Sequence, residues 1–445
     1  MTDTIELTVD KIVPGGDGIG RSGGMVVFVP QTAPGDRLKV RIHTRKRSYW
    51  QGTVEEIIEP SPLRTRPACP YYGVCGGCDL QHLSYDSQLV VKKLILNDAL
   101  QRIGRVFVPP SNPLPAESPW RYRNKSQYPA SGPPWRIGFF QRRSHRIVDI
   151  SQCLVQPEVL DHLRSAVKLR LEESSETSYD ETTRAGNIRH VVVKYSRATG
   201  QACLMFVTAG TELTPSAYSG LTNQHPELAS IVHNVNPDPV NRIAGSAFRT
   251  LAGKPFYHER VLGLTLQVSS ASFFQANTSA TELLVKRILK YLEPDGTEQV
   301  LDLYCGVGTI TVPIAGFVRG VIGVEANPSA VNDARANLEQ DGVRNAEIRH
   351  AAVEDAIAQI DSTDAVVLDP PRKGCEAGVV RELGRLKPRI IVYVSCNPTT
   401  LARDIARLQL VGYSVEEIQP LDMFPQTSHI ETIVKLVQTA NRETA

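Results

Sequence analysis

From Ser270 to the C-terminus, short apolar runs alternate with longer stretches in which apolar residues recur at helical spacing. The pattern predicts a helix at 278–292, strands at 299–303, 320–324, 346–350, 365–368 and 390–394, and a terminal hairpin of strands 414–418 and 431–437. Strands that alternate with helices form a parallel sheet with helices on both faces. Ligands of such a sheet bind beyond the carboxyl ends of its strands.

Residues 1–62 follow a different pattern, in which short strands are separated by glycine and proline turns. This predicts a small β-barrel. The strand at 37–42 alternates apolar and basic residues, so its basic side chains should share one face. The run 37–47 holds six basic residues and no acid, and Tyr49 and Trp50 beside it offer stacking surfaces. A basic face with aromatic neighbours is suited to RNA, whereas most charged runs are simply solvated.

The segment between these parts contains one helical pattern, at 84–106, and is otherwise mainly β up to residue 268. We therefore predict a multidomain fold with a small N-terminal β-barrel, a mainly β central domain that holds a metal cluster, and a C-terminal Rossmann-like α/β domain. The predicted boundaries are 1–62 for the barrel, 63–83 with 107–268 for the central domain, and 84–106 with 269–445 for the α/β domain.

Composition is ordinary for a globular chain of 445 residues, with 41% apolar and 22% charged residues and a net charge of +2. The first residues form no signal peptide, and no apolar run is long enough to span a membrane. We expect a cytoplasmic protein. In that compartment its eight cysteines should be reduced, metal-bound or catalytic.

Three cysteines, Cys69, Cys75 and Cys78, lie within ten residues, and glycines between them allow a tight loop. Such a group in a cytosolic protein binds metal far more often than it packs in a core. Cys153 is a candidate fourth ligand. Zinc and a [4Fe–4S] cluster both accept four thiolates, and the spacing does not decide between them. Four protein ligands predict a closed, structural site.

The segment 301–311, LDLYCGVGTIT, predicts a buried strand, a glycine turn and the start of a helix. These three together open a nucleotide-binding unit. The turn lacks the full GxGxxG pattern, and Asp302 stands just ahead of it, which favours a cofactor without a pyrophosphate, such as S-adenosylmethionine. Glu325 ends the next strand, from where a carboxylate can hold ribose hydroxyls.

Three more motifs follow or begin strands of the same sheet. Asp369 opens a stiff DPPRKG loop, Cys396 follows strand 390–394, and Glu431 is the acid of an otherwise apolar strand. A lone cysteine at a strand end is usually a core residue. At the cofactor side of a sheet it has the position that a nucleophile needs, and Glu431 is suited to act as a base.

Together these motifs resemble the RNA uracil-5-methyltransferase family, which makes 5-methyluridine, and most closely its branch acting on bacterial 23S ribosomal RNA. The resemblance covers nearly the whole chain. It implies that the N-terminal barrel is a TRAM domain, an RNA-binding module. It also implies S-adenosylmethionine as the cofactor and a [4Fe–4S] cluster at the cysteines.

The resemblance assigns roles residue by residue. Cys396 matches the nucleophile and Glu431 the general base. Where the family often has Asn, this chain has Thr309, and the acid on the adenine side is Glu354 or Asp355. The implied cofactor contacts are Gln275, Tyr304, Thr309, Glu325 and Asp369, and the implied cluster ligands are Cys69, Cys75, Cys78 and Cys153.

Cys396 would add to C6 of uracil, which requires surroundings that lower its pKa. Three rival functions stay open: a tRNA 5-methyluridine methyltransferase, an amino-methyltransferase that uses the Asp369 loop, and a non-catalytic RNA-binding factor. Ribosomal RNA is favoured as the partner because tRNA enzymes of this family generally lack the TRAM domain and the cluster cysteines. We expect a monomer with no membrane partner.

Overall fold

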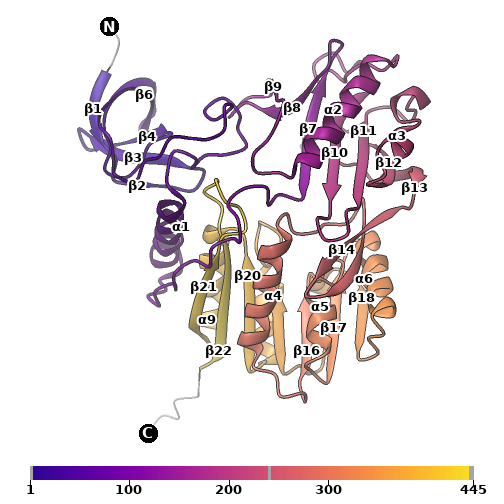
Figure 1. Ribbon diagram of the computed structural model, residues 1–445. Coiled ribbons are helices and arrows are strands. Elements are labelled where there is room, and N and C mark those ends of the chain that lie inside the picture. Colours follow the sequence, from indigo (N-terminus) through magenta and orange to yellow (C-terminus); the bar gives the residue numbers. More distant parts are fainter. Residues whose placement is uncertain (1–3, 239–241, 440–445) are drawn as a thin grey trace.

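The computed structural model describes residues 4–238 and 242–439, which form three large sheets and a separate hairpin (Figure 1). The N-terminal sheet lies beside helix α1, Tyr85–Ala99, and the central sheet lies above the C-terminal sheet in this view. Helix α1 continues as a π-helical turn, η1, Leu100–Gly104. None of the helices in the described ranges is long and apolar enough to cross a membrane.

The N-terminal sheet has the strand order β1-β5-β6-β4-β3-β2. Leu7, Val27, Val29, Leu38 and Val40 fill its core and are almost fully buried. The strands are β1 Thr4–Thr8, β2 Lys11–Ile12, β3 Asp17–Ser22, β4 Met25–Pro30, β5 Arg37–Arg45 and β6 Tyr49–Glu59.

The predicted basic face of β5 exists, but acids of the neighbouring strands neutralise part of it. Arg37 forms ion pairs with Glu6 of β1 and Glu59 of β6, and Arg41 pairs with Glu55. The prediction considered β5 alone and did not include the strands that pair with it. Arg45 stacks on the Trp50 ring, with its guanidinium carbon 3.9 Å from the ring centroid.

The central sheet has the order β13-β12-β11-β10-β7-β8-β9. One face is covered by helix α2, Glu158–Glu172, whose Leu160, Leu163, Val167 and Leu171 are buried against the sheet. The prediction of a mainly β segment did not include this helix. The remaining elements are β7 Lys125–Ser131, β8 Arg136–Phe140, β9 Ile147–Asp149, β10 Ile188–Tyr195, β11 Ala202–Thr208, η2 Pro215–Ala217, α3 Leu221–Gln224, β12 Leu228–Val235 and β13 Ala247–Gly253.

The C-terminal sheet has the order β18-β17-β16-β19-β20-β22-β21. Strands β16 to β20 are parallel, and β22 pairs antiparallel with β20 and β21. This confirms the predicted sheet and its terminal hairpin. The strands are β16 Gln299–Leu303, β17 Gly320–Glu325, β18 Ala346–His350, β19 Ala365–Leu368, β20 Ile390–Ser395, β21 Tyr413–Leu421 and β22 Glu431–Gln438.

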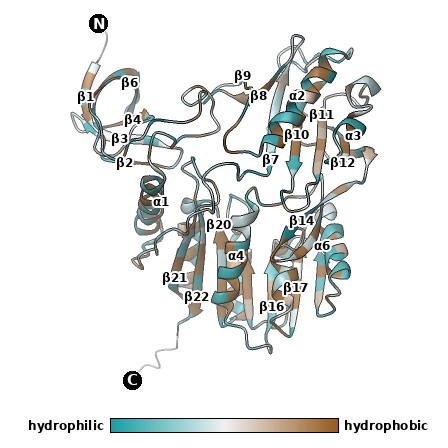
Figure 2. Ribbon diagram, in the orientation of Figure 1, coloured by the Kyte–Doolittle hydropathy of each residue, from teal (hydrophilic) through white to brown (hydrophobic). Residues whose placement is uncertain are grey.

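Helices cover both faces of the C-terminal sheet, as the alternation of elements predicts. Helices α4 and α5 pack on one face, whereas α7, α8, α9 and α1 pack on the other. The apolar stretches of β20 and β22 therefore lie in the interior (Figure 2). The helices are α4 Thr278–Leu292, α5 Thr311–Ala315, α6 Pro328–Gln340, α7 Val353–Ile357, α8 Ala377–Leu386 and α9 Pro398–Leu410.

A hairpin of β14, Phe256–Val261, and β15, Leu264–Ser269, joins the central and C-terminal sheets. Its Tyr257 and Leu266 share one apolar core with Met205 of the central sheet and Ala334 of α6. The two large domains therefore share part of their core at the edge where the functional site lies.

Candidate active site

The glycine turn after β16 is held to the end of β17 by a carboxylate. The Gly306 amide donates to Glu325 Oε2 at 3.0 Å, and the Asn327 amide donates to Glu325 Oε1 at 2.7 Å. Gly306 and Gly308 have φ values of 58° and 83°, in the left-handed region that favours glycine. Tyr304 also has a positive φ of 67° and is half-buried. Glu325 thus lies where predicted and has backbone partners.

Asp302 lies beneath this turn and is fully buried. Its Oδ2 accepts a hydrogen bond of 2.5 Å from Thr311 Oγ1. Burial raises the pKa of Asp302 to about 7, with Asp369 and Glu325 adding negative charge nearby. Thr309, the predicted contact of the same turn, is half-buried and lies two residues before α5 begins.

Asp369 and Glu431 form the acidic centre of the rim. Burial raises the pKa of Asp369 to about 7, and it raises that of Glu431 well above its usual value, with Asp369 adding to the effect. Only 2% of the Glu431 surface is exposed. The Gln275 side-chain amide donates to Asp369 Oδ2 at 3.4 Å. Residues predicted on separate loops therefore meet at one place.

Cys396 lies at the same rim and is half-buried at the end of β20. Its pKa is raised to about 11, chiefly by burial and also by the charges of Glu431 and Asp369, whereas Arg372 opposes the shift. The lowered pKa that thiolate addition requires is therefore not found in this structure, because burial raises the pKa of Cys396 and the two acids add to that effect. The three motifs predicted to converge, at the ends of β19 and β20 and the start of β22, do lie together.

Two polar residues that sequence reasoning missed position the Gln275 loop. Asn124 donates to the Gln275 carbonyl at 2.9 Å and to Thr278 Oγ1 at 3.0 Å. Lys194 Nζ, buried in β10, donates to the carbonyls of Ser269, Ser270 and Ser272 at 2.9–3.1 Å. The one available signal for Lys194 is a lysine within the apolar run VVVKY.

Asp333 of α6 supports the same loop from the other side. Its carboxylate accepts from the Ser269 amide at 2.8 Å and from Ser272 Oγ at 2.6 Å.

Glu354 and Asp355, the two candidates for the adenine side, are exposed in the first turn of α7.

The four predicted cluster cysteines line one cavity of about 330 Å³ between the central and C-terminal domains. Cys69, Cys75 and Cys78 come from one loop, and Cys153 comes from the segment after β9. Burial raises the pKa of Cys78 and Cys153, and Cys69 and Cys75 add smaller effects in the same direction. Within residues 4–238 and 242–439, no three His, Cys, Asp or Glu side chains converge on the position of a single metal ion.

Two sequence families match the chain. The family described as tRNA (Uracil-5-)-methyltransferase matches residues 262–439, and the TRAM domain matches residues 2–54. An uncharacterized RNA methyltransferase of Halalkalibacterium halodurans is 38% identical over 98% of this chain and 97% of its own length. Another, of Thermosynechococcus vestitus, is 40% identical over 97% of this chain and 98% of its own length.

The solved structure of Pyrococcus abyssi tRNA (uracil-54, C5)-methyltransferase, in complex with S-adenosyl-L-homocysteine, is similar over the whole fold. Its TM-score is 0.79 at 31% sequence identity, covering 97% of this chain and 99% of that chain. This chain belongs to the RNA uracil-5-methyltransferase family. As a member of that family it combines a TRAM domain with a C-terminal methyltransferase domain, which contains the rim described above.

Proposed function

We propose that this methyltransferase transfers a methyl group to C5 of a uridine in RNA through a covalent adduct. The observation that carries the proposal is the meeting of Cys396, Glu431 and Asp369 at one rim, beside Gln275. A thiol nucleophile and a buried carboxylate base are the two groups that C5 methylation of uracil needs. An amino-methyltransferase needs neither.

The rim fits S-adenosylmethionine as the methyl donor. Three carboxylates with raised pKa values lie there: Asp302 and Glu431, which are buried, and Asp369, which is half-buried. A cationic ligand offsets that negative charge, and the sulfonium of S-adenosylmethionine is a cation. The residues that would hold the cofactor are Gln275, Tyr304, Thr309, Glu325 and Asp369. When bound, it supplies the methyl group that C5 accepts.

The reaction begins when the Cys396 thiol gives its proton to solvent and adds through sulfur to C6 of uracil. C5 then carries enolate character and would accept the methyl group as the methyl–sulfur bond of the donor breaks, with S-adenosylhomocysteine as the leaving group. Glu431 removes the C5 proton, the C5–C6 double bond reforms, and the C6–sulfur bond breaks. Arg372 lowers the pKa of Cys396 and so favours the thiolate. The target base must leave its stack to reach this rim.

Two substitutions test this scheme. Cys396→Ala removes the nucleophile and should abolish methylation with no adduct. Glu431→Gln leaves the addition possible but removes the base, so a protein–RNA adduct should accumulate. The adduct is measured as a band of reduced mobility in denaturing gels with labelled RNA. Methylation by Cys396→Ala, or turnover by Glu431→Gln without adduct, contradicts the covalent scheme.

The cysteine-lined cavity fits a [4Fe–4S] cluster, because four thiols from two segments face one space of about 330 Å³. In a cubane each thiolate binds a different iron, so the sulfurs surround the cluster and need not converge on one ion. Cys69, Cys75, Cys78 and Cys153 would hold it. Protein purified without oxygen should be brown, and Cys78→Ser should lose the colour and part of its thermal stability. A colourless protein with stoichiometric zinc would contradict this assignment.

We propose ribosomal RNA as the substrate, supported by the four cysteines that tRNA enzymes of the family generally lack, with tRNA as the second candidate. The architecture favours tRNA more than the sequence motifs suggest, since a tRNA enzyme from Pyrococcus abyssi matches 97% of this chain. The TRAM domain and overall length therefore do not separate the two substrates.

A further inference from the structure

The segment between β21 and β22, residues 422–430, leads directly into the proposed base Glu431, and we call it the base loop. It is largely buried, and Phe424, Thr427 and His429 line the cysteine cavity. At its end, His429 Nδ1 lies 3.2 Å from Arg372 Nη2, next to the nucleophile. The base loop therefore extends from the cysteine cavity to the reacting groups.

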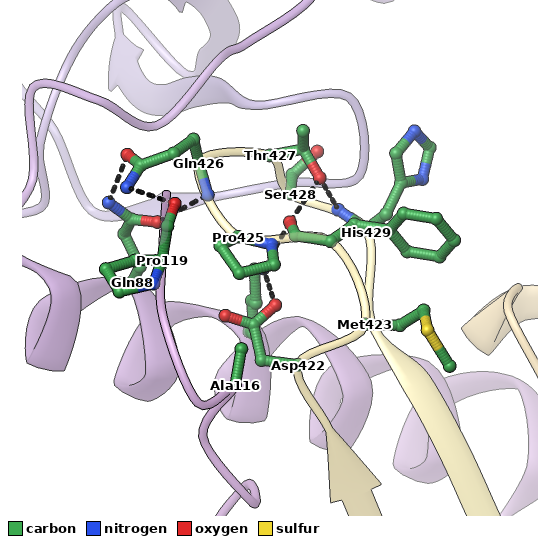
Figure 3. Close-up of polar contacts among 12 residues, drawn as sticks. Gln88, Ala116, Pro119, Asp422, Met423, Pro425, Gln426, Thr427, Ser428 and His429 are labelled. Atoms are coloured by element: carbon green, nitrogen blue, oxygen red, sulfur yellow. Dashed lines mark hydrogen bonds and ion pairs between the residues drawn. The ribbon is translucent and has the colours of Figure 1, made fainter. Parts of the chain in front are cut away.

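Side chains of α1 hold the first half of the base loop, and Figure 3 shows one of them, Gln88, beside Gln426. Gln88 and Gln426 form a reciprocal pair. Gln88 Nε2 donates to Gln426 Oε1 at 3.0 Å, and the backbone N–H of Gln426 donates to Gln88 Oε1 at 2.9 Å. Lys92 Nζ donates to Asp422 Oδ1 at 2.5 Å and to the Phe424 carbonyl at 3.0 Å. These contacts fix the loop to a helix of its own domain.

The second half is held by Asp79, the residue directly after Cys78. The Ser428 amide donates to Asp79 Oδ1 at 2.7 Å, and Ser428 Oγ donates to Asp79 Oδ2 at 2.8 Å. In return, the backbone N–H groups of Asp79 and Leu80 donate to the backbone carbonyl of Gln426 at 3.1 and 3.0 Å. Both carboxylate oxygens of Asp79 thus bind a residue three positions before Glu431.

A turn of the TRAM domain also contacts Asp79 and the base loop. The Gly15 amide donates to Ser428 Oγ at 3.2 Å, and Gly16 packs so closely on Asp79 that a Cβ at Gly16 would overlap its carboxylate. Arg142 and Arg143 of the central domain bind Asp17 in the same turn. The TRAM turn, the cysteine loop and the base loop therefore meet at Asp79 and Ser428.

We propose that Asp79 is a positioning residue for Glu431. Through Ser428, Asp79 transmits the conformation of the cysteine loop to the proposed base. The proposal rests on the proposed function. Charge-assisted hydrogen bonds from a carboxylate to a backbone amide are short and directional, so they fix the base loop at a point near its catalytic end. A displacement of about 1 Å at a reacting group reduces turnover by as much as about 10²-fold. The cysteine loop would then influence catalysis without contributing a reacting group.

The test compares Asp79→Ala, Asp79→Asn and Ser428→Ala with the matched control Asp86→Asn, an exposed carboxylate in the first turn of α1. We expect kcat of Asp79→Ala to fall about 10–100-fold, as expected for a base displaced by up to about 1 Å. KM for RNA and for S-adenosylmethionine should stay within about twofold, because the groups that bind both are unchanged. Asp79→Asn retains one acceptor oxygen and should recover part of the loss. The control should behave as wild type.

The fraction of protein trapped as RNA adduct during turnover identifies the affected step. If Glu431 is displaced, removal of the C5 proton slows while addition of Cys396 does not, so the adduct should accumulate in Asp79→Ala. A general structural defect would lower both steps and raise KM. Ser428→Ala lies far in sequence from the cysteines and should show the same change to a smaller extent, with unaltered cysteine-site absorbance.

Wild-type kcat in Asp79→Ala and Ser428→Ala would overturn the proposal. A fall in kcat without adduct accumulation would also overturn it, since that result assigns Asp79 a structural role alone. Failure of the proposed function looks different, because the wild-type protein would then methylate no uridine and form no adduct.

Discussion

Charge at the catalytic rim is the main feature at the scale of single residues. Cys396 lies beside Glu431 and Asp369, and Arg372 is the cation that opposes them. Burial raises the pKa of Cys396, and the two acids add to that effect. A cationic cofactor would offset this negative charge, so binding of the methyl donor should itself promote formation of the thiolate.

This arrangement predicts how activity depends on pH. A base acts in its deprotonated form, and both Glu431 and Cys396 have raised pKa values, so kcat/KM should increase with pH through the alkaline range, up to the Cys396 pKa of about 11. Asp369→Asn removes one negative charge, which lowers both pKa values. The rising limb should then move to lower pH by roughly one unit, although KM for the cofactor increases.

The measurement is kcat/KM for RNA from pH 5.5 to 9.5 at saturating S-adenosylmethionine, with Asp86→Asn as a control for the loss of an exposed carboxylate. If the rising part of the kcat/KM profile stays in place in Asp369→Asn, or moves to higher pH, Asp369 does not act electrostatically on the reacting groups.

Single-residue roles could be predicted from the sequence only where a local motif marks them. Asp369, Cys396 and Glu431 each stand at a strand boundary that the apolar pattern reveals. Asn124 and Asp79 were missed because their partners, Gln275 and Ser428, are far away in sequence. The Cys396 pKa was misjudged for a related reason: it depends on charges that the fold brings together from other strands.

At the scale of elements, a buried ion pair joins α1 to the base loop. Lys92 and Asp422 are both fully buried, and their atoms approach to 2.5 Å. Burial lowers the pKa of Lys92, and Asp422 opposes the shift. Such a pair adds little compared with an apolar replacement, but it is costly to break.

Lys92→Met leaves Asp422 as an uncompensated buried charge and should lower the free energy of unfolding by about 3–5 kcal/mol. The double variant Lys92→Met/Asp422→Leu removes both charges and should recover most of that loss. Urea denaturation of the wild type and of the single and double variants measures the effect. Equal stability of the single and double variants would contradict the ion-pair interpretation.

Most elements with strong periodicity were predicted, whereas features that depend on strand pairing were not. The parallel strands of the C-terminal sheet lie within one or two residues of their predicted bounds. Helix α2 was missed although its buried leucines and valine recur at helical spacing. The basic face of β5 was predicted from one strand, whereas the acids of β1 and β6 that neutralise it are supplied by strand pairing.

At the scale of the whole molecule, three domains are joined at the places where chemistry is proposed. The hairpin β14–β15 shares its core with both large sheets, and the TRAM turn reaches the base loop. The multidomain order was predicted from changes in pattern along the chain. The contacts between the domains could not be, because they join residues such as Gly15 and Ser428 at opposite ends of the sequence.

Release of tritium from RNA labelled at C5 of uracil tests the central claim most directly. The protein is incubated with S-adenosylmethionine and either protein-free large-subunit rRNA or total tRNA, with Cys396→Ala as the control. We expect release from rRNA that depends on the cofactor and on Cys396. Release from tRNA alone would keep the chemistry and change the substrate, whereas no release from either RNA would contradict C5 methylation.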